Sequence, residues 1–374
     1  MTGPLQGIRV LEVGGIGPGP FAAMVLADLG ADVVRIDRPA AVQFDLHAAG
    51  DLLARGRRSV VVDLKHPEGV EVALALAESS DALIEGFRPG VAERLGVGPD
   101  VCLERNPRLV YGRMTGWGQD GPYAQRAGHD IDYIALAGAL EPIGRPGQPP
   151  TPPLNLVGDF GGGGMLLALG IACALLERAS SGKGQVIDAA IVDGAALLTT
   201  LFHSVPMGQT ATGALDGSAP YYDVYECADG KYVAIGAVEP EFYAELRRVM
   251  RLDGPEWDAQ RDRSTWPDRK AELAARFRTR SRSEWCDVFE GADACFAPVL
   301  SLDEAPQHPH NVARGTFAEI LGVVQPSPAP RFSRTPATLR RPPVAAGQDT
   351  DEVLAEIGFD QGDLARLGAA GVVR

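Results

Sequence analysis

The sequence predicts an α/β fold with a large, doubly wound domain and a smaller α+β domain. Over the first third of the chain, apolar strand-like segments alternate with helical ones, as in a parallel sheet covered by helices. Residues 220–240 instead alternate aromatic and β-branched residues around the turn ADGK, which predicts a β-hairpin opening a second domain. A length of 374 residues favours two domains over one. We therefore expect the large domain to be Rossmann-like.

The chain opens with a predicted βαβ unit. Residues 7–13, GIRVLEV, have the composition of a buried strand, and residues 21–30, FAAMVLADLG, that of a helix. A second strand is predicted over residues 31–38, ADVVRIDR. Such a unit places the loop after the first strand at the carboxyl edge of the sheet, where ligands of these folds bind.

The glycine-rich loop after the first strand has two interpretations. Gly15-x-Gly17, with Asp37 at the end of the second strand, matches part of a dinucleotide-binding fingerprint. Pro18 and Pro20 argue against it, because Pro20 occupies the third glycine position and prolines lack the N–H groups that a pyrophosphate needs. A nicotinamide site is therefore disfavoured.

Further strands and helices continue the alternation. A strand running into a turn is predicted over residues 59–69, and helix, strand and loop over residues 70–90. Residues 109–122, LVYGRMTGWGQDGP, predict a strand followed by a glycine-rich loop. Residues 180–198 predict turn, strand and helix. These segments complete a doubly wound sheet.

Basic residues flank the predicted strands. Taken singly, each is most simply a solvated surface charge. As a group at strand carboxyl ends they fit an anionic nucleotide tail, and Arg38 suits a phosphate on a nucleotide ribose. The group comprises Arg55, Arg57, Arg58, Lys65, Arg88 and Arg94.

The second half of the chain predicts the domain boundaries. We expect the large domain to comprise residues 1–200 and 325–374, with a linker over residues 201–220. The small domain is expected over residues 221–324, including a linker back. Helical patterns follow the hairpin, then the strand-like CFAPVLSL. The proline-rich tract of residues 325–343 predicts an extended strap, and DTDEVLAEIGF a final helix.

Composition excludes several classes of function. The formal charge is 35 − 49 = −14, which argues against a nucleic-acid surface and against attraction to anionic membranes. The longest apolar run, residues 166–176, is too short to span a bilayer and predicts a buried helix. MTGPLQGIRV has no secretion-signal pattern, so we expect a cytoplasmic protein without membrane insertion. Five cysteines without CxxC spacing support neither a disulfide framework nor a zinc site.

Two ionisable residues stand where a glycine-containing loop turns into an apolar helix. His129 precedes DIDYIAL, and Asp159 precedes FGGGGMLLALG. A helix start stabilises anions and favours a neutral imidazole, so the two positions suit a paired acid and base. Each residue alone could be only a helix cap. The GGGG run favours function, because it costs helix propensity unless a ligand or another backbone approaches closely.

Other candidate residues carry weaker signals. Glu239, in the turn AVEPEFY, could orient an imidazole, although an acid before Pro240 is also a helix cap. His308 and His310 form an HPH motif, for which surface or capping roles are favoured over metal binding. The sequence contains no GxSxG, Walker, HExxH or EF-hand pattern. No metal site is expected.

Long motifs make the sequence recognisable as similar to the family III CoA-transferase superfamily, over essentially the whole chain. They are GIGPGPFAAMVLADLGADVVRIDRP, TGWGQDGP, AGHDIDYIAL, PPLNLVGDFGGGGM, SSGKGQVIDAAIVDG, APYYDVYECADGKYVAIGAVEPEFY and APRFSRTP. Within the superfamily the resemblance is to enzymes that racemise 2-methylacyl-CoA thioesters. It implies an interlocked homodimer and no cofactor, since CoA is part of the substrate. The glycine-rich loop after the first strand then belongs to a CoA-binding face.

The resemblance also implies roles for individual residues. His129 and Asp159 would be the catalytic pair, and Glu239 would hold the imidazole from the partner chain. The backbone N–H of Asp130 is our candidate donor to the developing oxyanion. The implied substrate- and CoA-binding residues are Ile16, Arg38, Val62, Asp63, Leu64, Lys65, Gly86, Phe87, Arg88, Arg94, Gly128, Ile131, Asp132 and Tyr133.

Two alternatives stay open from the sequence. A CoA-transferase of the same fold would use Asp159 as a nucleophile that forms an acyl anhydride. His129 discriminates, because such a transferase needs no second proton-transfer base there. A non-catalytic acyl-CoA carrier is the other alternative, and the paired ionisable residues argue against it. The acyl group, whether bile-acid intermediate, branched fatty acyl or arylpropionyl, stays open.

Overall fold

The computed structural model describes residues 3–39, 51–145, 147–204 and 215–374. These residues form two compact units, each with its own apolar core. Unit 1 comprises Met1–Ala137, Pro153–Leu198 and Gly315–Arg374, and unit 2 comprises Gly138–Pro152 and Thr199–Arg314.

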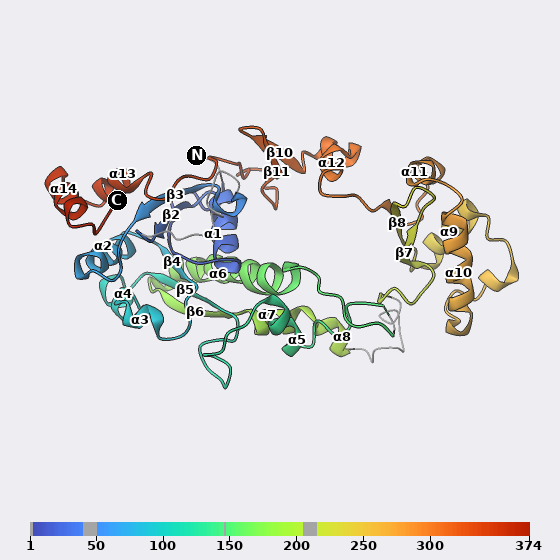
Figure 1. The fold of residues 1–374 in the computed structure, drawn as a ribbon, viewed down its shortest axis with the longest axis horizontal. Helices are drawn as coiled ribbons and strands as arrows, with labels where there is room; N and C mark the ends of the chain where they lie inside the picture. The colour runs from blue at the N-terminus through green and yellow to red at the C-terminus, as the bar shows by residue number, and fades with distance from the viewer. Residues whose placement is uncertain (1–2, 40–50, 146, 205–214) are drawn as a thin grey trace. The chain divides into compact units, whose positions relative to one another are not determined.

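Unit 1 is built on a parallel sheet of strand order β3-β2-β1-β4-β5-β6 (Figure 1). Its strands are β1 (Arg9–Val13), β2 (Asp32–Asp37), β3 (Arg57–Val61), β4 (Ala82–Glu85), β5 (Val110–Thr115) and β6 (Gln185–Ala190). Each neighbouring pair is parallel. This order confirms the predicted α/β fold. Because the chain reverses its direction of winding between β1 and β4, a crevice opens at the carboxyl ends of those two strands.

Helices cover both faces of this sheet. One core lies between the strands and helices α2, α4, α13 and α14, and includes Val72, Leu76 and Leu354. The other lies against α1, α5, α6 and α7, and includes Leu26 and Leu167. The helices of unit 1 are α1 (Pro18–Asp28), α2 (Pro67–Glu78), α3 (Val91–Arg94), α4 (Pro99–Arg105), α5 (Asp130–Leu136), α6 (Leu166–Ser181), α7 (Ile191–Leu198), α13 (Thr350–Glu356) and α14 (Gln361–Ala369), with the short η1 (Leu52–Ala54).

The glycine run before α6 forms a π-helix, η2 (Leu156–Met165). Its glycines allow close approach of other backbone segments. A Cβ on Gly162 would lie 2.6 Å from the backbone nitrogen of Ala195 in α7, and one on Gly164 2.5 Å from the carbonyl oxygen of Pro18. The sequence allowed either a ligand or another backbone beside this run, and the structure places α7 and the start of α1 there.

Gly194 of α7 faces Gly162 at the tightest point of this contact. A Cβ on Gly194 would lie 1.8 Å from the Gly162 carbonyl oxygen. We therefore expect Gly194→Ala to force α7 away from η2 and to lower the free energy of unfolding by about 1–3 kcal/mol, measured by urea denaturation.

Gly368→Ala is the matched control, because Gly368 lies in α14 and nothing stands within 4 Å of its Cβ position. This control should leave stability unchanged or raise it by up to about 1 kcal/mol. Equal effects of the two substitutions would contradict the packing argument.

The helix running from η2 through α6, Leu156–Ser181, is long and apolar enough to cross a membrane by length and composition, with a mean hydropathy of 1.7. The core helix of a soluble protein meets the same criterion. Leu167 and Ile171 of α6 are fully buried in the core with the sheet. Leu169 and Leu176 of the same helix are 56% and 74% exposed, so only one face of the helix that the sequence predicts to be buried is covered by the core.

Unit 2 holds an antiparallel sheet of order β7-β8-β9. Its strands β7 (Tyr222–Glu226) and β8 (Tyr232–Gly236) form the predicted hairpin around ADGK, and β9 (Phe296–Pro298) pairs with β8. Its helices are α8 (Thr200–Ser204), α9 (Pro240–Met250), α10 (Trp266–Phe277), α11 (Arg282–Phe289) and α12 (Pro309–Arg314), with the short η4 (Pro255–Trp257), η5 (Arg263–Thr265) and η6 (Ala305–Gln307).

Two segments fall outside the expected domain boundaries. Residues 138–152 join unit 2, where Arg145 pairs with the buried carboxylate of Asp223 at 2.5 Å. Residues 315–324 join unit 1, where they contribute β10 (Phe317–Ile320) and the start of β11 (Val323–Pro326). Of the expected linker, residues 205–214 lie outside the described residues, and Thr200–Ser204 is helical.

The C-terminal segment returns to the strands of unit 1 (Figure 1). Val373 forms a bridge with Val62 after β3, and the Thr350 hydroxyl contacts the backbone of Arg374 and Val61. The helix predicted over DTDEVLAEIGF is α13, but it is not the final one, because α14 follows it. The β10–β11 hairpin was not predicted either.

Candidate active site

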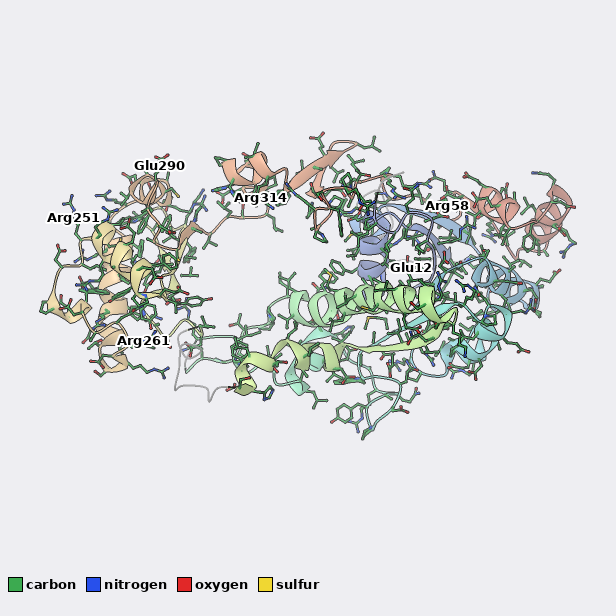
Figure 2. The ribbon with its side chains drawn as sticks, turned by 180° about the vertical axis from the view of Figure 1, so that it is seen from behind. Glu12, Arg58, Arg251, Arg261, Glu290 and Arg314 are labelled. Atoms are coloured by element: carbon green, nitrogen blue, oxygen red, sulfur yellow. The ribbon has the colours of Figure 1, made fainter. Side chains whose placement is uncertain are left out.

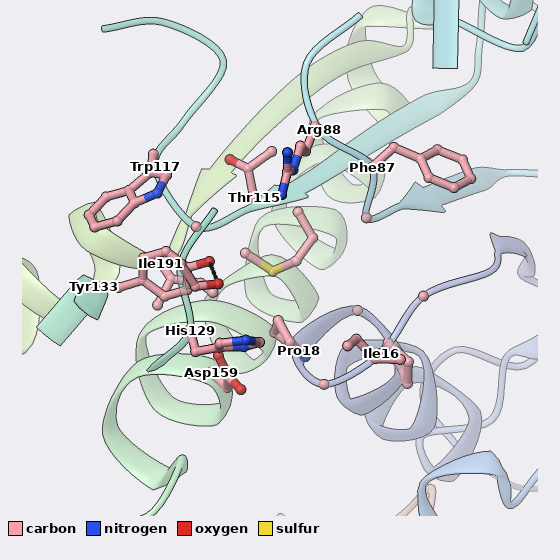
Figure 3. A pocket seen from close by; sticks show the side chains of 18 of the residues that line it. Ile16, Pro18, Phe87, Arg88, Thr115, Trp117, His129, Tyr133, Asp159 and Ile191 are labelled. Carbon is pink, nitrogen blue, oxygen red and sulfur yellow. Dashed lines mark hydrogen bonds between the residues drawn. The ribbon is translucent and has the colours of Figure 1, made fainter. Parts of the chain in front are cut away.

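A cavity of about 380 Å³ opens in unit 1 at the carboxyl ends of β1, β4 and β5 (Figure 3). The loop after β1, the loop after β4 and the segment after β5 line it, together with the residues before α5 and the first turn of η2. The crevice between β1 and β4 is where a sheet of this order binds ligands. His129 and Asp159 both line this cavity.

His129 is the residue before α5, with an extended backbone and an exposed side chain. Its backbone N–H donates to Asp132 Oδ2 at 2.9 Å. His129 and Asp132 form a capping box at the start of α5, and His129 also lines the cavity. The sequence allowed His129 to be only a cap, and its place in the lining of the cavity shows that it is more than that.

Asp159 lies in the first turn of η2, with its carboxylate partly buried. Its backbone N–H donates to Asp130 Oδ1 at 2.6 Å. A Cβ on Gly17, in the loop after β1, would lie 3.3 Å from Asp159 Oδ2 and crowd the carboxylate, and the positive φ of 70° at this position also favours glycine.

The pKa of Asp159 is raised above its ordinary value of 3.8. Burial is the main cause, and the negative charge of Asp130 adds to it. A hydrogen bond from the Asn155 side chain and the charge of His129 act in the opposite direction. Asp159 can therefore serve as proton donor as well as acceptor. Figure 3 shows its carboxylate beside the His129 imidazole, next to Pro18.

Aromatic residues hold the chain on either side of His129. The Tyr133 hydroxyl donates to the carbonyl oxygen of Gly128 at 2.5 Å, and its ring packs edge to face on Trp117, with ring centres 4.7 Å apart. Burial raises the pKa of Tyr133 to about 12, so the hydroxyl stays protonated and keeps this bond. A Cβ on Gly116 would lie 2.0 Å from the Tyr133 ring, which is why the segment after β5 needs glycine there.

Six of the predicted substrate-binding residues meet at this cavity, namely Ile16, Gly86, Phe87, Arg88, Gly128 and Tyr133. The others lie outside it. Arg38 follows β2 and residues 62–65 follow β3, on the same edge of the sheet. Arg94 ends the short helix α3, and Ile131 and Asp132 lie in the first turn of α5.

The loop after β4 is held by a buried carboxylate that the sequence did not single out. Glu85 Oε2 accepts the backbone N–H of Phe87 at 2.7 Å. Arg113 of β5 donates to Glu85 at 3.0 Å and pairs with Glu93 of α3 at 2.9 Å. This network connects the loop at Phe87 with α3. A charged residue at the end of an apolar strand was the available signal.

Three basic residues do not belong to an anion site, contrary to the expectation. Arg55, Arg57 and Arg58 lie at the amino end of β3, away from its carboxyl end. Each is held in an ion pair, with Asp28, Glu12 and Asp32 respectively, at distances of 2.5, 2.9 and 2.6 Å. Figure 2 labels Glu12 and Arg58 in unit 1.

The Asp37 carboxylate, the acidic residue of the disfavoured dinucleotide fingerprint, already has partners within the sheet. It accepts from Arg35 at 2.9 Å and from the Ser59 hydroxyl at 2.5 Å, and the residue is buried. A fingerprint acid that binds a ribose must be free to accept from the sugar hydroxyls. Asp37 is therefore not available to bind the ribose of a nicotinamide cofactor.

Glu239 belongs to unit 2, where it precedes α9 and forms no side-chain cap. Its role beside an imidazole stays a prediction. Asn155, which the sequence analysis missed, precedes η2; Asn before an apolar helix is a capping pattern that could have identified it. In the part of the chain that the structure describes, no group of three or more His, Cys, Asp or Glu side chains is placed to hold a metal ion.

Comparison with known proteins extends over nearly the whole chain. A sequence model described as CoA-transferase family III matches residues 5–350. The chain is 45% identical over 378 residues to α-methylacyl-CoA racemase of Mus musculus, covering 99% of this chain and 97% of that relative. It is 44% identical over 380 residues to α-methylacyl-CoA racemase of Homo sapiens, with the same coverage of 99% and 97%.

A solved structure supports the fold. A CAIB/BAIF family protein from Brucella suis has a TM-score of 0.82 and 24% identity, and the match covers 96% of this chain and 100% of that one.

Proposed function

The chain belongs to CoA-transferase family III, and from this premise we propose that it is an α-methylacyl-CoA racemase, which interconverts the R and S epimers of 2-methylacyl-CoA thioesters. The identity of 44–45% to two such racemases supports the assignment. The observation that carries it is the pairing of His129 and Asp159 in one cavity, with the pKa of Asp159 raised. Two proton-transfer groups are what racemisation needs.

The reaction moves one proton off the α-carbon and another onto its opposite face. His129 removes the α-proton of the S epimer, and the C–H electron pair passes into the thioester to form an enolate. Asp159, in its protonated form, then donates its proton to the other face and gives the R epimer. The roles reverse for the R epimer. The thioester itself acidifies the α-proton, so the proposed steps need no cofactor.

The enolate oxygen requires a hydrogen-bond donor in the same site. The backbone N–H of Asp130 is the first of α5 and has no carbonyl partner within that helix. We assign it to the developing oxyanion. Because Asp130 directly follows His129, the oxyanion donor and the proton-transfer base are adjacent in the chain.

The CoA part of the substrate is assigned to the carboxyl edge of the sheet. Arg38 and Lys65, both exposed, follow β2 and β3, and the loop at Arg88 follows β4 and lines the cavity. Exposed cations at this edge suit the phosphates of a nucleotide. Val62 is buried, so only its backbone is available. An interlocked homodimer in which the partner chain supplies Glu239 completes the proposal.

Incubation of one epimer of 2-methylacyl-CoA in deuterated water tests the function. Incorporation of α-deuterium together with loss of optical purity is the expected result. Acyl-CoA exchange to an added free acid, without deuterium at the α-carbon, would instead support a transferase with Asp159 as nucleophile. Neither reaction would support a carrier. A series of acyl groups then defines the preferred substrate.

The pH dependence of this reaction should respond to Asn155. The active enzyme holds one proton between His129 and Asp159, so kcat/KM is expected to follow a bell-shaped curve in both directions. The Asn155 hydrogen bond lowers the pKa of Asp159. Asn155→Ala removes that bond, so the acidic limb of the curve should move to higher pH than in the wild type. An unmoved limb, with thermal unfolding unchanged, would contradict this role.

A further inference from the structure

We propose that the Asp130 side chain is a positioning residue that holds Asp159 in place relative to His129. The proposal rests on the proposed function, because it concerns the two residues assigned as acid and base. Asp130 directly follows His129, and its Oδ1 accepts the Asp159 backbone N–H at 2.6 Å. One hydrogen bond therefore connects the start of α5 to the first turn of η2, across 29 residues of sequence.

The burial of Asp130 is unusual for a carboxylate. The residue is 7% exposed, and its Oδ2 is buried without a hydrogen-bond partner among the described residues. No described cation forms an ion pair with it. A buried carboxylate without a cation is costly, so its retention calls for a local function. Holding Asp159 and adding negative charge beside it are the two effects available.

Gly158 makes this contact possible. A Cβ on Gly158 would lie 2.4 Å from Asp130 Oδ1 and 3.0 Å from Ile134 Cγ2. Any larger residue at position 158 would push the carboxylate away from the Asp159 N–H. Gly158 is therefore needed for the hydrogen bond between Asp130 and Asp159.

The charge of Asp130 acts on Asp159 in addition to its position. Burial is the first cause of the raised pKa of Asp159, and Asp130 is the second, with His129 opposing. Tyr133 of α5 also interacts with Asp159. The other charged or titratable residues on the elements packed against η2 are Asp28 in α1, Tyr111 and Arg113 in β5, Asp132 in α5, Cys173, Glu177 and Arg178 in α6, Asp188 in β6 and Asp193 in α7.

Two substitutions separate position from charge. Asp130→Asn keeps an oxygen that can accept the Asp159 N–H but removes the charge that raises the pKa of Asp159, so racemisation should persist while the acidic limb of the pH curve moves to lower pH. Asp130→Ala removes the acceptor, and a displacement of about 1 Å at the reacting groups should lower kcat for both epimers by about 10²-fold. Much of that loss should be recovered in Asp130→Asn. Gly158→Ala keeps the charge but displaces the acceptor, and should lose kcat as Asp130→Ala does.

Asp193→Asn is the matched control, because it removes an exposed carboxylate that does not line the cavity, from the helix α7 that packs against η2. Its pH limbs should stay at the wild-type positions. The positioning role is overturned if Asp130→Ala has wild-type kcat, or if the acidic limb of Asp130→Asn does not move while its thermal unfolding is unchanged. Failure of the wild type to racemise would instead overturn the proposed function.

Discussion

His129→Ala is expected to lower the rate of epimerisation by about 10²–10⁴-fold in both directions, because each direction needs both proton-transfer groups. The remaining proton exchange should depend on the epimer. Asp159 can still remove and return the α-proton of the R epimer, so that epimer should take up deuterium without inversion, whereas the S epimer should stay unlabelled. Mass spectrometry and chiral analysis of each epimer in deuterated water measure both quantities.

Asp159→Asn should give the mirror-image result. The S epimer should exchange through His129 without inversion, and the R epimer should not exchange. Binding of CoA, measured by calorimetry, and thermal unfolding serve as controls for the integrity of the cavity. If His129→Ala exchanged both epimers at the wild-type rate, the two-base assignment would fail.

Arg57→Leu should reduce the free energy of unfolding by about 3–5 kcal/mol, because it leaves the Glu12 carboxylate buried without its cation. Glu12 is 2% exposed and Arg57 1% exposed, and the pair is 2.9 Å apart. Arg57 also contacts the carbonyl oxygen of Pro20 in the first turn of α1. Loss of this contact should also weaken CoA binding at the loop after β1.

The double variant Glu12→Leu with Arg57→Leu should recover most of that stability, because no charge then remains buried. Arg58→Leu is the neighbouring control. Its partner carboxylates, Asp32 and Glu356, are 39% and 37% exposed, so they can be hydrated and the loss should be at most about 1 kcal/mol. A double variant as unstable as Arg57→Leu would contradict the argument. Urea denaturation measures all three.

The loss in Arg57→Leu should also depend on pH. Burial raises the pKa of Glu12 above 4.5, and Arg57 opposes that rise, so the pKa of Glu12 is higher still without Arg57. A carboxyl with a raised folded-state pKa keeps its proton in the folded state where the unfolded chain has already lost it. Its contribution to stability therefore falls as pH rises above 4.5. The difference from wild type should be smallest near pH 4.5 and largest above the folded-state pKa of Glu12.

The alternation of segments by itself determined the α/β class, because strand and helix periods are local properties of the sequence. The hairpin of β7 and β8 could be predicted from the sequence for the same reason. The π-helix η2 could not be predicted from the sequence, since its apolar pattern does not distinguish it from an ordinary helix. Its geometry comes from packing, with Gly162 against α7 and Gly164 against Pro18.

The candidate site also has features that are local in the sequence and features that depend on the tertiary structure. The sequence by itself placed His129 and Asp159 at helix starts, which are local positions, and the family motifs assigned them a shared reaction. Only the tertiary structure brought them to one cavity and showed the Asp130 carboxylate between their segments. It also removed Arg57 from the predicted anion site, because its partner Glu12 lies 45 positions away in the chain, on β1. Long-range pairing of charges depends on strand order and burial, which no local pattern encodes.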